Sequence, residues 1–301
     1  MATRKAGTDR RVHGFWLLLA GVSMLAGGCA GQRPSVSRYA QAQDSAPERL
    51  IDVSHVQDAV PRAEPRSRYG NPTSYEVFGK RYRTLQNSRG YSERGIASWY
   101  GTKFHGHRTS SGESYDMYSM SAAHKTLPLP TYARVTNLKN GKSVIVKIND
   151  RGPFHENRLI DLSYAAAARL EILGEGTGLV EVTAIDPQTH TRQATKPRIA
   201  PSQPKVAVGT PKPAPAVKPP THSPTLYLQL GAFSSRDNAE RLQSKLSAVE
   251  LPGTLQISKA TANNRPVYRV RVGPLASVES ADRLTQLLAN HGIHDPHVII
   301  D

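Results

Sequence analysis

The proline-rich stretch near the middle of the chain most constrains the fold, because it separates two patterned regions. Residues 187–224 contain the run PKPAPAVKPP, with no acidic residue and no sustained apolar period. Proline fixes φ and lacks a backbone N–H, so this composition favours an extended, partly polyproline II spacer. The hydrophobic cores of this 301-residue chain must therefore lie on either side of the spacer, in separate domains.

The region before the spacer, residues 94–186, is predicted to be a small β-rich domain. Alternating apolar residues predict several short strands, at residues 95–100, 132–136, 143–148 and 178–185. Asn140-Gly141 predicts a hairpin turn. One short helix is expected over residues 162–170, with Ser163 as its cap and an end at Gly174. Many short strands with one helix are typical of a small barrel.

The region after the spacer, residues 225–301, predicts an α+β domain with the order β-α-β-β-α-β. The strands are expected at residues 226–233, 254–260, 266–272 and 297–300, and the helices at 237–248 and 280–291. This ferredoxin-like, or RNP-like, order would cover one face of the sheet with both helices. On the open face, Tyr227 and Gln229 share one strand and Arg269 and Arg271 a later one. Gln229 is expected to meet Arg269 there, unless this face is simply solvated.

The N-terminus is predicted to direct export. Residues 1–28 combine a basic start with an apolar run of about fourteen residues, which is too short to span a bilayer comfortably and is typical of a signal peptide. Cys29, the only cysteine, follows small residues that resemble a bacterial lipobox, although an ordinary signal peptide with an incidental cysteine is the alternative. Residues 29–93 are then expected to be a mostly disordered tether, with a small hairpin over residues 74–82.

The net charge of +15 does not predict nucleic-acid binding. Most of the excess falls in residues 1–93 and 187–224, at +6 each, while the two predicted domains are almost neutral. Proteins that bind nucleic acid usually carry such charge on a folded face. The basic segments are therefore interpreted as solvated spacers. No cofactor is expected, and His105 and His107 lack the further ligands of a metal site.

Polar residues that follow the predicted strands are the candidates for chemistry. The stretch VIVKINDRGPF places Asp150 in the inward parity of Val146 and Ile148, directly before a cluster of turn formers. Asp150 is either the cap of that turn or an acid at the mouth of the core. Glu113, Asp116 and His124 are further candidates, which could equally be loop charges and a core histidine. Cleavage of a glycoside needs a protonated acid and usually a stabilising partner.

These residues belong to a set of motifs that resembles a known family. The motifs SWYG, SGESYDM, AAHKTLPLPT, VIVKINDRGPF and RLIDLSYAAA, all within residues 95–170, resemble those of the rare lipoprotein A family. LQLGAF and YRVRVGPL resemble the SPOR domain. The resemblance implies a six-stranded double-psi β-barrel joined to a SPOR domain. It also implies an endolytic peptidoglycan lytic transglycosylase that leaves 1,6-anhydromuramyl ends, with functional positions at Glu113, Asp116, His124 and Asp150.

In this interpretation Asp150 would donate a proton to the glycosidic oxygen, and the SPOR domain would bind glycan strands stripped of stem peptides through Gln229 and Arg269. The rival hypotheses are a hydrolase that uses Glu113 with Asp150, and a non-catalytic, expansin-like wall-binding protein. The expected location is the periplasmic face of the outer membrane at the septum, with a lipid on Cys29 and division proteins as further partners. Anchoring in the inner membrane is the less favoured alternative.

Overall fold

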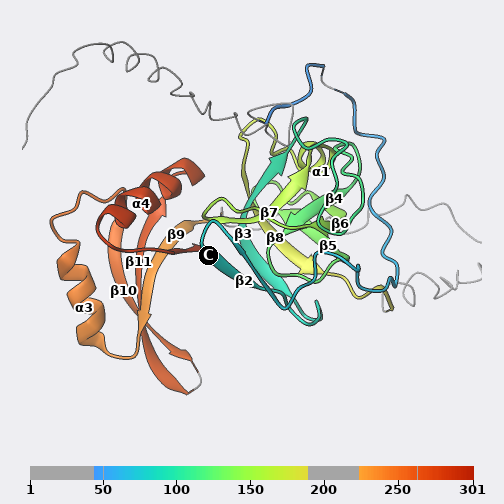
Figure 1. The fold of residues 1–301 in the computed structure, drawn as a ribbon. Coiled ribbons are helices and arrows are strands. Elements are labelled where there is room, and N and C mark those ends of the chain that lie inside the picture. The colour runs from blue at the N-terminus through green and yellow to red at the C-terminus, as the bar shows by residue number, and fades with distance from the viewer. Residues whose placement is uncertain (1–43, 50, 189–223, 263) are drawn as a thin grey trace, which may run out of the picture. The chain divides into compact units, whose positions relative to one another are not determined.

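The computed structural model describes residues 44–49, 51–188, 224–262 and 264–301 (Figure 1). The predicted signal segment, Cys29, the first part of the tether and most of the proline-rich spacer lie outside these residues. Within the described ranges, no helix is both long enough and apolar enough to span a membrane.

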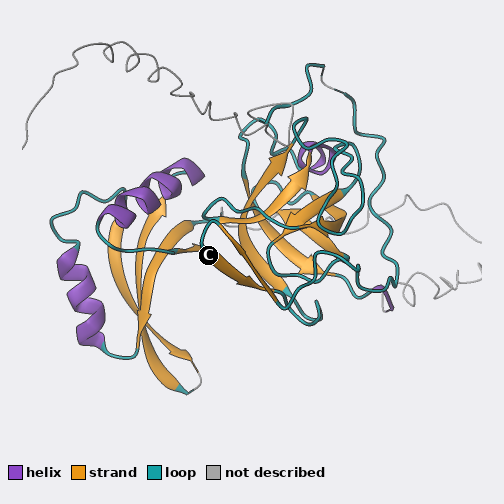
Figure 2. Ribbon diagram, in the orientation of Figure 1, coloured by secondary structure: helices purple, strands orange, loops and turns teal. Residues whose placement is uncertain are grey.

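Six strands close into a barrel in the order β3-β7-β4-β6-β5-β8 (Figure 2). They are β3 (Ser92–Tyr100), β4 (Ser121–His124), β5 (Thr131–Asn137), β6 (Ser143–Asp150), β7 (Arg158–Ser163) and β8 (Gly178–Ala184). The β3–β7 and β4–β6 pairs are parallel, and the other four pairs are antiparallel. The six-stranded barrel predicted from the sequence is confirmed.

Apolar side chains that alternate along the strands fill the barrel interior. Val144, Val146 and Ile148 of β6 are at most 1% exposed and pack against Val135 of β5 and Leu162 of β7. Burial of one such side chain stabilises the fold by roughly 1.5–3 kcal/mol. A slip of one residue would turn the whole row outward, so these rows fix the register of the strands.

The helix α1 (Tyr164–Arg169) begins where the sequence predicts but ends earlier. Ser163 is its N-cap, and the side chain accepts a hydrogen bond from Ala166 N. The helix ends at Arg169 because Glu171 adopts a left-handed φ of 59°. The N–H groups after the end then return to carbonyls of the last turn, as in a Schellman motif. The predicted end at Gly174 is therefore wrong.

Residues 51–91 lie against the barrel, whereas a mostly disordered tether was expected there. The hairpin forms as predicted, from β1 (Ser74–Val77) and β2 (Lys80–Arg83). Before it, Ala59 N donates to the carbonyl of Ile145 at 2.9 Å, and the Asn71 side chain exchanges hydrogen bonds with the backbone of Leu129. Val53 is buried. These backbone partners specify one path for the segment across the barrel surface.

The C-terminal domain has the predicted β-α-β-β-α-β order. Its elements are β9 (Leu226–Phe233), α3 (Arg236–Lys245), β10 (Thr254–Ala262), β11 (Arg265–Leu275), α4 (Val278–Asn290) and β12 (His297–Ile300). The four strands form an antiparallel sheet in the order β10-β11-β9-β12. Both helices pack on one face, where Leu284 and Leu288 meet Leu228 and Val272 (Figure 1). The other face is left open, as predicted.

Candidate active site

Asp150 ends β6 and is fixed by the loop between β3 and β4. Its Oδ1 accepts three hydrogen bonds, from Ser110 N at 2.8 Å, from Ser110 Oγ at 2.6 Å and from Arg151 N at 2.7 Å. No hydrogen bond to Oδ2 is found among the described residues. Donors that converge on one oxygen stabilise the negative charge of a carboxylate. One oxygen is thus held in place while the other remains available to a substrate.

The expected inward parity of Asp150 does not hold, because β6 contains a bulge. Ala122 of β4 pairs with Ile148, but the next residue, Ala123, pairs with Asp150, so Asn149 is an extra residue in β6. Ile148 and Asn149 are both buried, which breaks the alternation. Asp150 therefore lies with Ala123 on the outer face of the sheet, at the rim of the barrel and not in its core-facing row.

Glu113 is anchored to the same end of β6. Its Oε1 accepts a hydrogen bond from Lys147 Nζ at 2.8 Å, and its Oε2 accepts one from Asn149 Nδ2 at 2.7 Å. The loop that carries Glu113 also carries Ser110, the partner of Asp150. The structure thus brings Glu113 and Asp150 to one junction between loop and strand.

Arg151 braces this junction, a role that the sequence did not assign to it. Its guanidinium donates to the carbonyls of Gly70 at 2.8 Å, Leu127 at 2.6 Å and His124 at 3.1 Å, and to Asn71 Oδ1 at 3.2 Å. Arginine offers several donors in a fixed plane, which suits this spread of acceptors. The position within NDRGPF, directly after the candidate acid, was the available signal.

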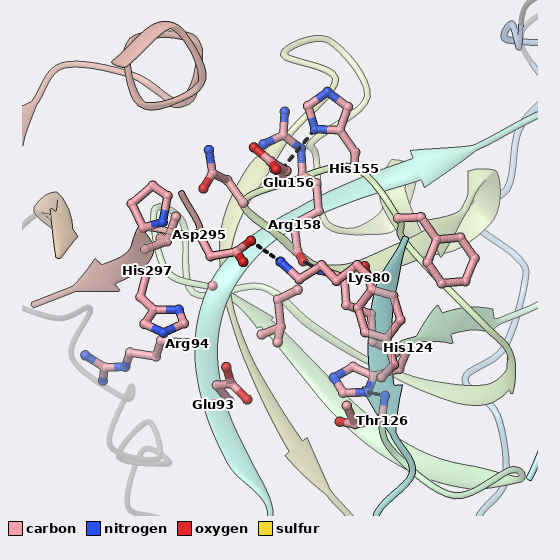
Figure 3. Close-up of a pocket in the computed structure, with 18 of the residues that line it drawn as sticks. Lys80, Glu93, Arg94, His124, Thr126, His155, Glu156, Arg158, Asp295 and His297 are labelled. Atoms are coloured by element: carbon pink, nitrogen blue, oxygen red, sulfur yellow. Dashed lines mark hydrogen bonds and ion pairs between the residues drawn. The ribbon is translucent and has the colours of Figure 1, made fainter. Parts of the chain in front are cut away.

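His124 is a buried, neutral side chain. It is 2% exposed and lies beside Thr126 (Figure 3). Its Nδ1 accepts hydrogen bonds from Thr126 N at 3.2 Å and Leu127 N at 3.1 Å. Nε2 lies 2.9 Å from Tyr91 Oη, which donates to Glu93. Burial, together with the nearby positive charges, lowers the pKa of His124 to about 3. The ring therefore fixes the end of β4 and is neutral near pH 7.

Asp116 is not brought to the junction. Its side chain is 55% exposed, and Oδ1 accepts a hydrogen bond from Tyr118 N at 3.0 Å. His105 Nδ1 lies 3.8 Å away, a loose ion pair when the imidazole is protonated. In the part of the chain that the structure describes, no three His, Cys, Asp or Glu side chains group as metal ligands would.

Asp161 of β7 is a second carboxyl group close to Asp150 that sequence reasoning missed. Burial raises the pKa of Asp161 to about 7, and the charges of Asp44 and Asp150 add to this effect, while the nearby Ser98 hydroxyl and the charge of Arg158 oppose it. Perturbed carboxyl groups beside a candidate acid are typical of active sites. The RLIDLS motif contained Asp161, but nothing in it distinguished the residue from an ordinary strand acid.

The open face of the C-terminal sheet carries the predicted polar residues, but the pairing of β9 with β11 differs from the expected pairing. Gln229 pairs with Arg271, whereas Arg269 pairs with Ala232, because the register of β9 against β11 shifts between Val270 and Arg271. Arg271, and not Arg269, is therefore the direct cross-strand partner of Gln229, and Arg269 is a diagonal neighbour on the same face. On the other side of β9, Gln229 and Tyr227 pair with His297 and Ile299 of β12.

The comparisons with known proteins assign a class to this pair of domains. A family model described as a lytic transglycolase, of the double-psi barrel type, matches residues 92–183. A SPOR domain model matches residues 223–299. The fold and the matches together define a double-psi β-barrel protein of the lytic transglycosylase class with a C-terminal SPOR domain.

Relatives narrow the class to one family. The endolytic peptidoglycan transglycosylase RlpA of Pseudomonas aeruginosa is 41% identical over 291 residues, 85% of this chain and 84% of that protein. RlpA of Vibrio cholerae is 50% identical over 182 residues, 60% of this chain and 65% of that protein. The chain belongs to the RlpA family of enzymes. Among solved structures, the RlpA SPOR domain from Pseudomonas aeruginosa is 35% identical and covers 25% of this chain and 96% of its own, with a TM-score of 0.24.

Proposed function

We propose that this chain is an endolytic lytic transglycosylase that cleaves the β-1,4 bond between N-acetylmuramic acid and N-acetylglucosamine in peptidoglycan. The observation that carries the proposal is the pair of carboxyl groups, Glu113 and Asp150, anchored at one junction between a loop and β6. The names of the relatives, endolytic peptidoglycan transglycosylase, support this substrate.

In the proposed reaction the C6 hydroxyl of the muramyl sugar attacks its own anomeric carbon and forms a 1,6-anhydro end. An intramolecular nucleophile is already in place, so no water needs to be activated. The three donors on Oδ1 hold Asp150 in place, where it can stabilise positive charge on the sugar ring and accept the hydroxyl proton. This differs from the sequence-based hypothesis, in which Asp150 is the acid.

Glu113 and His124 support this chemistry in different ways. Glu113 is paired with Lys147 and Asn149 and remains 44% exposed, so it can accept hydrogen bonds from sugar hydroxyls or amides. His124 positions the carbonyl that Arg151 binds, and Arg151 N in turn binds Asp150. Asp116 would act only through a substrate long enough to reach its loop.

Asp150→Asn is expected to lower the yield of anhydro-ended products by about 100-fold or more, the usual effect of removing a proton-transfer group. Asparagine keeps an oxygen that can accept from Ser110, so the fold should persist. The measurement is mass spectrometry of amidase-treated sacculi digested with the purified chain. Glu175→Gln is the matched control, because Glu175 is a 65% exposed carboxylate paired only with Lys139 in the described ion pairs.

Normal yields of anhydro ends from Asp150→Asn would remove Asp150 from the reaction. The same digest separates the two rival functions. Products with reducing ends would identify a hydrolase that uses Glu113 with Asp150. Binding to sacculi without any released product would identify a non-catalytic wall-binding protein.

The open face of the SPOR domain is proposed to bind glycan strands that lack stem peptides and so to direct the enzyme to the septum. Arginine and glutamine side chains beside Tyr227 offer donors and an aromatic ring, a combination suited to sugars and their amides. The proline-rich spacer would keep the barrel close to strands that the SPOR domain has bound, which raises its local concentration there. Division proteins at the septum are further proposed partners.

The proposed location is the periplasmic face of the outer membrane, with the chain held there by a lipid on Cys29. The support is the basic start, the short apolar run and the lipobox-like residues that precede this single cysteine. Covalent lipid adds about 0.8 kcal/mol of membrane affinity for each buried methylene group, so a lipidated cysteine with several acyl chains would hold the protein firmly.

A further inference from the structure

A cluster of enclosed polar atoms lies on the outer face of the barrel wall formed by β3, β7, β4 and β6. Tyr100 Oη, Ser121 Oγ, Asn149 Oδ1 and Asp161 Oδ1 are each shielded from solvent, and none has a partner at ordinary hydrogen-bond distance and angle within the described residues. Ser121 lies near enough to Tyr100, and Ser98 near enough to Asp161, to lower the pKa of each, but neither contact has the geometry of a full hydrogen bond. Buried polar atoms are almost always paired. Four unpaired ones within a single layer therefore indicate a place where water or substrate hydroxyl groups complete the hydrogen bonding.

Strand register places these residues on one face. Ala97, Ala122, Ile160 and Leu162 point into the barrel core. Side chains alternate along a strand, so the residues next to them point outward. Ser98 pairs with Asp161, and Asp161 in turn pairs with Ala123. Tyr100 and Ser121 lie two residues from Ser98 and Ala123, on the same face.

The register also sets the distance between the two carboxyl groups. Ala123 pairs with Asp161 of β7 on one side and with Asp150 of β6 on the other. Neighbouring strands lie about 4.8 Å apart, so the Cα atoms of the two acids are about 10 Å apart. Ala123 lies between them along the sheet. This Cα spacing is compatible with the separation of about 5–9.5 Å that glycoside-cleaving carboxyl pairs use.

The surroundings of the two acids differ. The pKa of Asp161 is raised to about 7, mainly by burial, so a large fraction of Asp161 carries a proton at neutral pH. Asp161 is partly exposed as a residue, although its Oδ1 is shielded from solvent. Asp150 Oδ1 is instead held by three hydrogen bonds from Ser110 and Arg151. A carboxyl group that keeps its proton beside a second, firmly positioned one is the arrangement expected of an acid and its partner.

We propose that Asp161 is the proton donor of this active site and that Asp150 is the partner carboxylate that accepts the proton of the attacking hydroxyl. The inference rests on the proposed transglycosylation. Asp161 transfers its proton to the glycosidic oxygen, and the electron pair of the breaking C1–O4 bond stays on that oxygen. The C6 oxygen forms the new bond to C1 and releases its proton to Asp150. Proton exchange through solvent then returns both acids to their starting states, and no water is consumed.

Tyr100 of β3, the strand next to β7, belongs to the same layer. Burial raises the pKa of its hydroxyl well above the ordinary value, and the charges of Tyr115, Asp150 and Asp161 add to the effect. The hydroxyl is therefore a neutral donor that can hold a sugar oxygen beside Asp161. The ionisable side chains that interact with Asp161 are Asp44, Asp150, Arg158, Tyr100 and Tyr115.

The test compares Asp161→Asn with Asp150→Asn in the purified full chain. On amidase-treated sacculi, Asp161→Asn should lose about 100-fold or more of the anhydro-ended product while it still binds sacculi. Wild-type activity should fall as pH rises through about 7, the pKa of Asp161, and the residual activity of Asp161→Asn should lack this fall. Glu175→Gln should match the wild type in both measurements.

A substrate whose leaving group needs no proton distinguishes a proton donor from a residue that only supports the fold. On a muramyl oligosaccharide that carries 4-nitrophenol at its reducing end, Asp161→Asn should recover most of the lost rate, and Asp150→Asn should not. If Asp161→Asn does not fold, ¹³C NMR titration of the Asp161 carboxyl in the wild type decides: a midpoint near 7 supports the inference, and one near 4 overturns it.

Full activity of Asp161→Asn with an unchanged pH profile, or equal recovery of both variants on the activated substrate, would overturn the donor role. A wild-type chain that yields no anhydro ends would instead contradict the proposed function itself. The two failures are therefore distinguishable in one set of digests.

Discussion

Burial favours the neutral form of two titratable side chains, His124 and Asp161. Their contributions to stability change with pH in opposite directions. The folded pKa of His124, about 3, lies below its ordinary value of 6.5. Below pH 6.5 the unfolded chain gains a proton that the folded chain does not, so stability is lost as pH falls from 6.5 toward 3. The folded pKa of Asp161, about 7, lies above its ordinary value of 3.8. Stability is therefore lost as pH rises from 3.8 toward 7.

Between about pH 4 and pH 6.5 these two slopes should largely cancel in the wild type, and single variants should uncouple them. Relative to the wild type, the free energy of unfolding of Asp161→Asn should rise with pH by up to about 1.4 kcal/mol per unit. That of His124→Asn should fall with pH to a similar extent. Urea denaturation followed by the fluorescence of Trp99, at each pH, measures both slopes.

Glu175→Gln, which changes an exposed carboxylate, should run parallel to the wild type across this pH range. Curves for Asp161→Asn or His124→Asn that also run parallel to the wild type would show that the residue in question titrates alike in the folded and unfolded chains. His124→Asn should in addition be less stable at pH 7, because Thr126 N and Leu127 N lose their shared acceptor.

At the scale of elements, alternation in the sequence predicts most of the strands but not the irregularities that place the functional side chains. The row Val144, Val146, Ile148 predicts β6 because each side chain gains by burial. The bulge at Asn149 depends instead on the pairing with β4, which no local pattern encodes. The pairing of Asp161 with Ala123 likewise depends on the closed order of the barrel. The candidate acids could therefore be named from motifs, but their partnership could not.

The same limit applies to the SPOR sheet, where the register shift in β9 changes which arginine is the neighbour of Gln229. We expect Gln229→Ala and Arg271→Ala each to weaken binding to amidase-treated sacculi by about tenfold, since each removes hydrogen bonds to a charged or amide group. Arg269→Ala should have a smaller effect, because Arg269 pairs with Ala232 at the end of β9. Pelleting assays with full-length variants measure the binding.

Loss of the fold is not expected in these variants, because the side chains lie on the open face, away from Leu228 and Leu284 of the core. Circular dichroism provides the control for folding. A larger loss of binding from Arg269→Ala than from Arg271→Ala would contradict the assignment of Arg271 as the closer partner of Gln229.

At the scale of the whole molecule, the proposed anchor, barrel, spacer and SPOR domain follow one another along the chain. Cys29→Ser should release the protein from the membrane fraction, since the acyl chains would have no attachment point. Its activity on purified sacculi should not change, because the proposed site lies in the barrel. Cell fractionation and metabolic labelling with a fatty acid measure the first effect, and membrane association that persists without label would contradict the anchor.

The hydrogen bonds of Arg151 also determine where the chain can be truncated without disturbing the candidate active site. Three atoms of its guanidinium reach residues on both sides of the domain boundary that the sequence suggests at residue 94, including Gly70 and Asn71. A fragment cut at that boundary would leave charged donors without acceptors beside Asp150, and would strip Glu64 from Lys147. The smallest catalytic fragment therefore begins near Asp44, whose carboxylate binds Gly101 N and Lys103 N.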